Sequence, residues 1–363
     1  MAAAARRIGL DYYRRQQRLT RKAVNRIQAL WGLLDAADLT GSWDAGVGRR
    51  IVEMVAAGQL ASAGLADDYV DAVADAEGAD PERVGKVRPS SFAGLASDGR
   101  ALESLMYLSV ISTKERIGRG LGVQDALMAG LRHALMLGSS EVTQAGRAAV
   151  GSSMAGKRTI QGYVRVVQPP ACGRCIILAG VEYGWNKGFQ RHPRCDCVHL
   201  PTTLIARNQG RRGGAINSDV YSPTTRPGAG GRGFLDPNAY FRGLSRAEQE
   251  RVFGVAGARA IREGADMAQV VNARRGMATM TAYGRQVLAT REGTTRRGAF
   301  YRLERARTEQ QTGIRFARDR IETQQGLPRF ELRTPRLMPE QIFELAESRD
   351  EAVAMLRRFG YLT

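Results

Sequence analysis

Residues 8–34 read IGLDYYRRQQRLTRKAVNRIQALWGLL, and their hydrophobic pattern indicates the fold of the N-terminal part of the chain. Apolar side chains recur at spacings of three to seven, as one face of a helix requires, at Ile8, Tyr12, Leu19, Val24, Ile27, Trp31 and Leu34. The opposite side is basic and carries Arg14, Arg15, Arg18, Arg21, Lys22 and Arg26. The segment is therefore predicted to be an amphipathic helix with a basic outer face.

Helical patterns continue to about residue 156, so we expect an α-helical bundle over residues 1–156. Ser42 is expected to be the N-cap of a helix that extends to about Leu65. Further helices are predicted over residues 102–111, 123–137 and 139–154.

The character of the sequence changes after Lys157, and five further segments follow. Residues 157–206 contain two short β-branched runs, 163–167 and 196–200, which predict strands on either side of a Cys/His module. Residues 207–235 form a Gly/Pro/Arg-rich loop, and residues 236–275 are expected to be helical, with a capping box at Ser245-Arg246-Ala247-Glu248. Residues 276–335 have weak periodicity and many arginines, so we expect an extended or partly disordered segment, followed by a helical unit over 336–363.

The composition indicates contact with polyanions. The chain of 363 residues has a net charge of +18, and its apolar fraction of 43% is typical of proteins that bury a core. The charge is uneven, since residues 206–337 hold 25 basic and 12 acidic residues, whereas residues 51–130 hold 7 basic and 12 acidic ones. This distribution favours a protein-contacting part and a polyanion-facing part, although solvated helix faces and codon bias would give a similar pattern. No apolar run is long enough for a membrane span, and the N-terminus lacks a secretory signal, so we expect synthesis in the cytoplasm.

All four cysteines lie within 26 residues, as the pairs Cys172/Cys175 and Cys195/Cys197. The first pair is a C-x2-C turn, and the second lies in the sequence His192-Pro193-Arg194-Cys195-Asp196-Cys197-Val198-His199. Because side chains alternate along a strand, Cys195, Cys197 and His199 are expected on one face. The spacing predicts a zinc knuckle whose structural metal is bound by four of these six groups.

Several ligand sets remain open at this site. The four cysteines together would close the coordination shell and leave no position for water, which favours a structural over a catalytic metal. His192 is the alternative ligand in place of one cysteine. A disulfide or a metal-free cluster of packed thiols is also compatible with the spacing, although thiols usually stay reduced in the cytoplasm.

The cysteine pattern resembles that of the phage Mu F-like (MuF) minor head proteins of tailed bacteriophages, in an actinobacteriophage-type form. Their hallmark is a C-x2-C pair followed by H-P-x-C-x-C and a proline, matched here by Cys172, Cys175, the His192–Cys197 element and Pro201. The resemblance is strongest over residues 100–275, and a weaker similarity continues into the tail.

The resemblance implies a low-copy head component that acts in capsid assembly near the portal and can be packaged with the DNA. Its implied location is the virion head, after a stage in the host cytoplasm during assembly. Portal, major capsid and scaffold proteins are the expected partners. Residues 206–337 are expected to contact packaged DNA without sequence specificity, because no base-reading motif is visible.

Similar actinophage proteins, encoded between the portal and scaffold genes, are often identified as capsid maturation proteases, so an enzyme is the alternative. The histidine outside the cysteine window is His133, and the nearby hydroxyls are Ser139 and Ser140. A helix would hold His133 and Ser140 about two turns apart, unless Gly138 breaks the helix between them. The sequence around His133 favours a partly buried helical residue, and the G-x-S-x-G element of many hydrolases is missing.

A nucleic-acid-binding zinc protein is the third hypothesis. Such a protein would bind naked duplex DNA tightly at physiological salt. The sequence as a whole predicts a multi-domain, mainly α-helical protein with a small α+β zinc-knuckle-like insert. The residue patterns themselves do not indicate an enzyme, and the protease alternative depends on the family resemblance.

Overall fold

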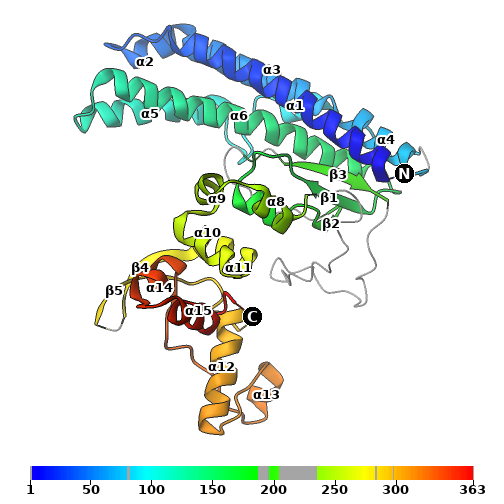
Figure 1. Cartoon of the computed structure of the whole chain (residues 1–363). Coiled ribbons are helices and arrows are strands. Elements are labelled where there is room, and N and C mark those ends of the chain that lie inside the picture. Colours follow the sequence, from blue (N-terminus) through cyan, green and yellow to red (C-terminus); the bar gives the residue numbers. More distant parts are fainter. Residues whose placement is uncertain are drawn as a thin grey trace. The chain divides into compact units, whose positions relative to one another are not determined.

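The computed structural model describes residues 2–79, 82–186, 195, 197–203, 235–282, 284–296 and 298–362. These residues form two compact units, whose elements are labelled in Figure 1. Within the described residues, the first unit contains those up to 168 and those within 179–203, and the second contains 169–178 and those from 235 onward. The fold is mainly α-helical, as the sequence predicted, and it contains two small antiparallel sheets, of which the sequence predicted strands only for the first.

The first unit is a helical bundle combined with one sheet. Its helices are α1 (Ala2–Trp31), α2 (Leu39–Ser42), α3 (Gly48–Ala63), α4 (Ala66–Ala76), α5 (Leu102–Gly118) and α6 (Val123–Ala155), with a π-helical turn at Trp43–Val47 and a 3-10 turn at Pro89–Phe92. The long helices α1, α3, α5 and α6 run alongside one another (Figure 1). One core lies among these helices and includes Ile27, Trp31, Ile51, Val55 and Met106.

Helix α1 confirms the amphipathic pattern. Tyr12, Ile27 and Trp31 are buried, whereas the arginines and Lys22 on the other side are exposed. The stretch 8–34 therefore places one face of a 30-residue helix in the bundle and leaves the basic face in solvent.

Two expectations within the bundle are wrong. Ser42 does not cap α3; Asp38 caps the preceding short helix α2 by accepting a hydrogen bond from the Gly41 amide at 2.8 Å, and the Ser42 hydroxyl donates to the Asp38 carbonyl. The two helices expected over 123–154 are one continuous helix, α6. Gly138 lies within α6 and is buried against Ile27 and Val55, so it serves packing rather than breaking the helix.

The sheet of the first unit has the order β2-β1-β3, formed by β1 (Gly162–Val166), β2 (Glu182–Gly184) and β3 (Val198–Thr202). Strand β1 is central and antiparallel to both neighbours, with Val164 opposite Leu200 and Arg165 opposite His199. A second core joins this sheet to α1, α4 and α6 through Tyr12, Val70, Val150, Tyr163 and Leu200. Strands β1 and β3 confirm the two predicted runs, except that β3 begins at Val198 and residue 196 lies outside the described residues.

The second unit combines short helices with a second sheet. Its helices are α7 (Gly173–Ile177), α8 (Pro237–Gly243), α9 (Arg246–Phe253), α10 (Val255–Arg262), α11 (Met267–Ala273), α12 (Ala299–Thr312), α13 (Arg320–Gln324), α14 (Pro339–Leu345) and α15 (Arg349–Arg358), with a 3-10 turn at Arg274–Gly276. The sheet has the order β4-β5-β6, formed by β4 (Met277–Ala282), β5 (Arg285–Thr290) and β6 (Arg336–Leu337). Its main core contains Val287, Phe300, Leu337, Ile342 and Leu356.

The capping box is confirmed, because the Ser245 side chain accepts from the Glu248 amide while the Glu248 carboxylate accepts from the Ser245 amide. The helix that follows, α9, ends at Phe253, and Gly254, with a φ of 76°, separates it from α10. The structure contradicts the expectation for residues 276–335, which contain strands β4 and β5 and helix α12 instead of extended or disordered chain. Almost all of the predicted loop 207–235 lies outside the described residues.

Candidate metal centre

The cysteine pairs lie in two loops next to the first sheet. The connection from β1 to β2 carries Cys172 and Cys175, and both of its ends are tied together, since Arg165 and Gly180–Val181 exchange backbone hydrogen bonds of 2.8 and 3.0 Å. Cys172 is the N-cap of α7, and its sulfur accepts from the Cys175 amide at 3.4 Å. Cys195 and Cys197 directly precede β3.

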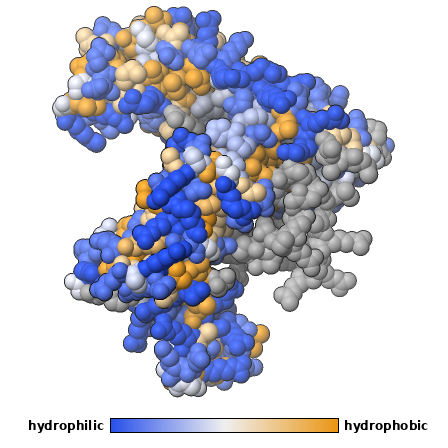
Figure 2. All heavy atoms as spheres, viewed as in Figure 1, coloured by the Kyte–Doolittle hydropathy of each residue, from blue (hydrophilic) through white to orange (hydrophobic). Residues whose placement is uncertain are grey.

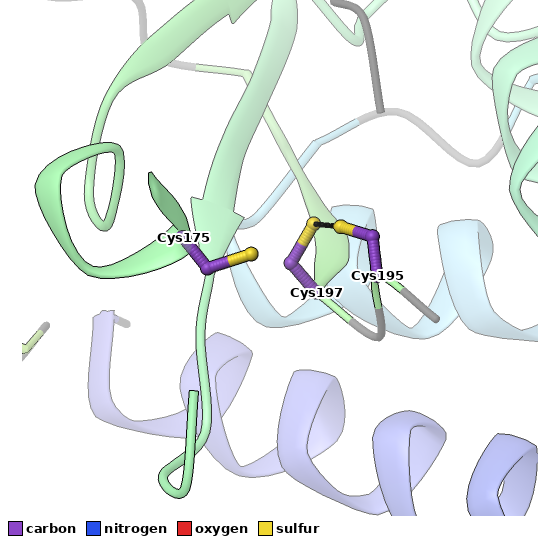
Figure 3. Close-up of side chains that lie close together, drawn as sticks. All are labelled: Cys175, Cys195 and Cys197. Atoms are coloured by element: carbon purple, nitrogen blue, oxygen red, sulfur yellow. Dashed lines mark hydrogen bonds between the residues drawn. The ribbon is translucent and has the colours of Figure 1, made fainter. Parts of the chain in front are cut away.

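Three thiols lie close together. The sulfur atoms of Cys175, Cys195 and Cys197 are within 4.8 Å of one another, and all three residues are buried (Figure 3). The Cys195 and Cys197 sulfurs are 3.3 Å apart, which is well beyond the length of a disulfide bond, about 2.05 Å. Three thiols in this arrangement could bind a metal ion, because thiolate sulfur is a preferred ligand of zinc and other soft metals.

The fourth ligand remains open. Cys172 is exposed and is not part of the three-thiol group, and His192 lies outside the described residues. His199 is not in the group either; its ring stacks on that of Tyr163, with centroids 4.0 Å apart. The sequence therefore identified three cysteines that meet, and the two remaining predicted ligands, Cys172 and His192, stay predictions.

Two buried arginines next to the thiols were not identified from the sequence. Arg165, 1% exposed, places its Nη2 3.6 Å from the Cys195 sulfur. Arg147 donates from Nε to the Cys197 carbonyl at 3.0 Å and from Nη2 to the Cys195 carbonyl. Arg147 thus fixes the backbone of the C-x-C turn, and the guanidinium of Arg165 lies against the Cys195 sulfur. The sequence signal that could have pointed to Arg165 was its position as a charged residue inside the β-branched run 163–167.

The two residues considered for proteolysis both lie on α6, seven positions apart. At 1.5 Å per residue this separation is about 10 Å along the axis, beyond the usual reach of a direct hydrogen bond between a base and its nucleophile. Burial, together with the nearby charge of Arg116, lowers the pKa of His133. The Nδ1 atom of His133 has no hydrogen-bond partner among the described residues. This arrangement fits a partly buried helical histidine.

Comparisons with known proteins give one match. The model of the family described as VG15 protein matches residues 4–209, which is more than half of the chain and includes all four cysteines. No curated protein and no solved structure matches. None of the helices in the described part of the chain has the length and apolar character needed to cross a membrane. The chain belongs to the VG15 protein family, a family of phage genes.

Proposed function

We propose that this protein is a minor head protein of a tailed bacteriophage or prophage that acts in head assembly near the portal. The observation that carries the proposal is the MuF-like cysteine motif, Cys172 to Cys197, within the segment that matches a phage gene family. Three cysteines of that motif meet in the fold, which supports a structural role for the motif.

Portal, major capsid or scaffold proteins are the proposed partners. Support comes from the apolar residues exposed near the end of the bundle, which include Leu33, Ile111, Leu121, Val123 and Met128. Figure 2 shows hydrophobic residues gathered on the surface over α2 and α5. Exposed apolar patches of this kind typically mark protein-binding surfaces. The basic segment 206–337 would contact packaged DNA.

The metal in the cysteine site is proposed to be a structural zinc ion. Cys175, Cys195 and Cys197 would supply three thiolates, and Cys172 or His192 would complete the tetrahedral site. The ion would fix the two loops that carry these cysteines, and the guanidinium of Arg165 would offset part of the negative charge of the thiolates.

Replacing Cys197 with serine is expected to remove the bound zinc and to lower the melting temperature by several degrees, because a hydroxyl is a poor zinc ligand. Elemental analysis of the purified full chain and a thermal melt measure the two effects. Cys172→Ser serves as the matched variant, since loss of zinc there would identify Cys172 as the fourth ligand. Wild-type protein without zinc, combined with an unchanged melting temperature of Cys197→Ser, would contradict the zinc site.

The head assignment is tested by peptide-resolved mass spectrometry of mature particles and of particles trapped before maturation. We expect the chain at low copy in mature heads, and unchanged processing of capsid and scaffold proteins when His133 and Ser140 are replaced by alanine. Loss of the chain from mature heads, with cleavage abolished in the variants, would replace this proposal with a maturation protease. Absence from every particle, with tight duplex binding by the free protein, would favour a nucleic-acid-binding zinc protein.

A further inference from the structure

The outer face of α1 carries an unusual density of positive charge. Helix α1 contains eight basic residues and one acidic residue, Asp11, which pairs with Arg15 at 2.9 Å. The remaining exposed basic residues form no ion pair with any described residue; they are Arg7, Arg14, Arg18, Arg21, Lys22 and Arg26. We call these six residues the α1 ridge.

The helix geometry places the α1 ridge along one continuous strip. At 100° per residue its members fall within an arc of about 140°, opposite the buried side that carries Tyr12 and Ile27. From Arg7 to Arg26 the strip is about 28 Å long at 1.5 Å per residue. The surface over α1 is mostly hydrophilic in Figure 2.

This arrangement opposes the stability of the isolated helix. Arg14, Arg18, Lys22 and Arg26 follow one another at intervals of four, so they form three successive like-charge pairs, and such pairs destabilise a helix. The one acidic residue of the helix, Asp11, is paired with Arg15, and no residue of the α1 ridge forms an ion pair with a described acidic side chain. An external polyanion would relieve the repulsion.

We propose that the α1 ridge binds the phosphate backbone of duplex DNA. Guanidinium groups bind phosphate oxygens through paired hydrogen bonds, and five of the six ridge residues are arginines. No large apolar side chain of α1 is exposed among its described residues, whereas the centre of a protein–protein interface is usually aromatic or aliphatic. Protein–DNA interfaces are polar and positively charged, as this surface is.

The proposed contact is independent of the head assignment and lies outside residues 206–337. Because the α1 ridge offers long basic side chains at regular intervals, it binds phosphates without reading base edges. Duplexes of different sequence therefore bind equally, and affinity falls steeply with salt as condensed counterions are released.

The test measures binding of the full-length protein to a fluorescently labelled 30-base-pair duplex by anisotropy, between 50 and 200 mM NaCl. The variant R14Q/R18Q/K22Q/R26Q removes four charges from the α1 ridge. The control R49Q/R50Q/R88Q/R119Q removes four charges from exposed residues elsewhere in the first unit. At 100 mM salt we expect the ridge variant to lose at least tenfold in affinity and the control less than threefold. The slope of log affinity against log salt should fall by about 3 to 4 in the ridge variant, since each lost phosphate contact contributes about 0.9.

A ridge variant that binds within threefold of wild type would overturn the proposal, and would leave an acidic protein surface as the partner of α1. An equal loss in the control would also overturn it, because net charge alone would then explain binding. The melting temperature of the ridge variant should equal or exceed that of wild type, since repulsive pairs are removed. If the variant fails to fold, chemical cross-linking of wild-type protein to the duplex decides the question by whether cross-linked peptides come from α1.

Discussion

Replacing Arg336 with leucine is expected to lower the free energy of unfolding of the second unit by about 3–5 kcal/mol. The side chain is 1% exposed and lies inside the unit. Its Nε donates to the Phe359 carbonyl at 2.9 Å, Nη1 donates to the Glu292 carbonyl at 3.0 Å, and Nη2 donates to Gly360 at 3.2 Å. One residue thus joins β6 to the C-terminal turn and to the loop that follows β5.

The energetic reason is that leucine would leave three carbonyl oxygens without their donor, and each unsatisfied buried group costs about 1–3 kcal/mol. The guanidinium also lies 4.2 Å from the centroid of the Tyr361 ring, a cation–π contact. Burial lowers the pKa of Arg336, and burial raises the pKa of Tyr361 to about 12. Because Arg336 and Tyr361 are almost fully buried, solvent does not readily replace the lost hydrogen bonds.

Urea denaturation followed by circular dichroism, with hydrogen exchange of peptides from residues 336–362, measures the effect. Arg336→Lys should be intermediate, because an ammonium cannot reach all the acceptors of a planar guanidinium. Arg302→Leu is the matched control, since Arg302 is exposed on α12 and should leave stability almost unchanged. A loss below about 1 kcal/mol in Arg336→Leu would contradict this account.

The sequence predicted those parts of the fold that depend on local pattern. The regular spacing of buried side chains along α1 and the capping box of α9 each involve residues within a few positions of one another, and both are confirmed. The cap at Ser42 failed because Asp38, four residues earlier, offers a carboxylate that caps a shorter helix. A local pattern cannot decide between two polar residues that lie within one helical turn of each other.

The segment 276–335 was wrongly expected to be extended or disordered because its order depends on distant partners. Val287 and Phe300 pack with Leu337, Ile342 and Leu356, which come later in the chain. Its many arginines suggested solvent exposure, yet Arg336, just beyond its end, is buried and donates hydrogen bonds to three backbone carbonyls from two segments, the loop after β5 and the C-terminal turn. The amino-acid composition does not reveal that the hydrogen bonds of a buried arginine are satisfied by distant backbone carbonyls.

The candidate metal centre was only partly predictable for the same reason. The short spacing of Cys195 and Cys197 brings their sulfurs together locally, whereas the position of Cys175 depends on the pairing of β1 with β2 and β3. Arg147 reaches the site from the C-terminal part of α6, about fifty residues earlier in the chain. No spacing rule connects that helix to the cysteines.

Replacing Gly146 with valine is expected to lower the free energy of unfolding of the first unit by about 2–4 kcal/mol. Gly130, Gly138 and Gly146 recur every eight residues on the buried side of α6, and neighbouring helices approach closely there. A Cβ at Gly146 would overlap the side-chain amide of Gln16 and the hydroxyl of Ser62. These groups are hydrogen-bonded to each other at 2.8 Å, and Gln16 also donates to Tyr12 at 2.7 Å.

Valine would therefore break these buried hydrogen bonds, in addition to forcing α1 and α3 away from α6. Intrinsic helix propensity acts in the opposite direction, because glycine is the least favourable residue of a helix interior after proline. Gly151→Ala isolates that term, since a Cβ at this position of α6 meets no atom within 4 Å. It should stabilise the unit by up to about 1 kcal/mol. The two substitutions on α6 are therefore expected to change the free energy of unfolding in opposite directions, which thermal and urea unfolding of both variants measure. Changes in the same direction would show that close packing at Gly146 does not limit the stability of the bundle.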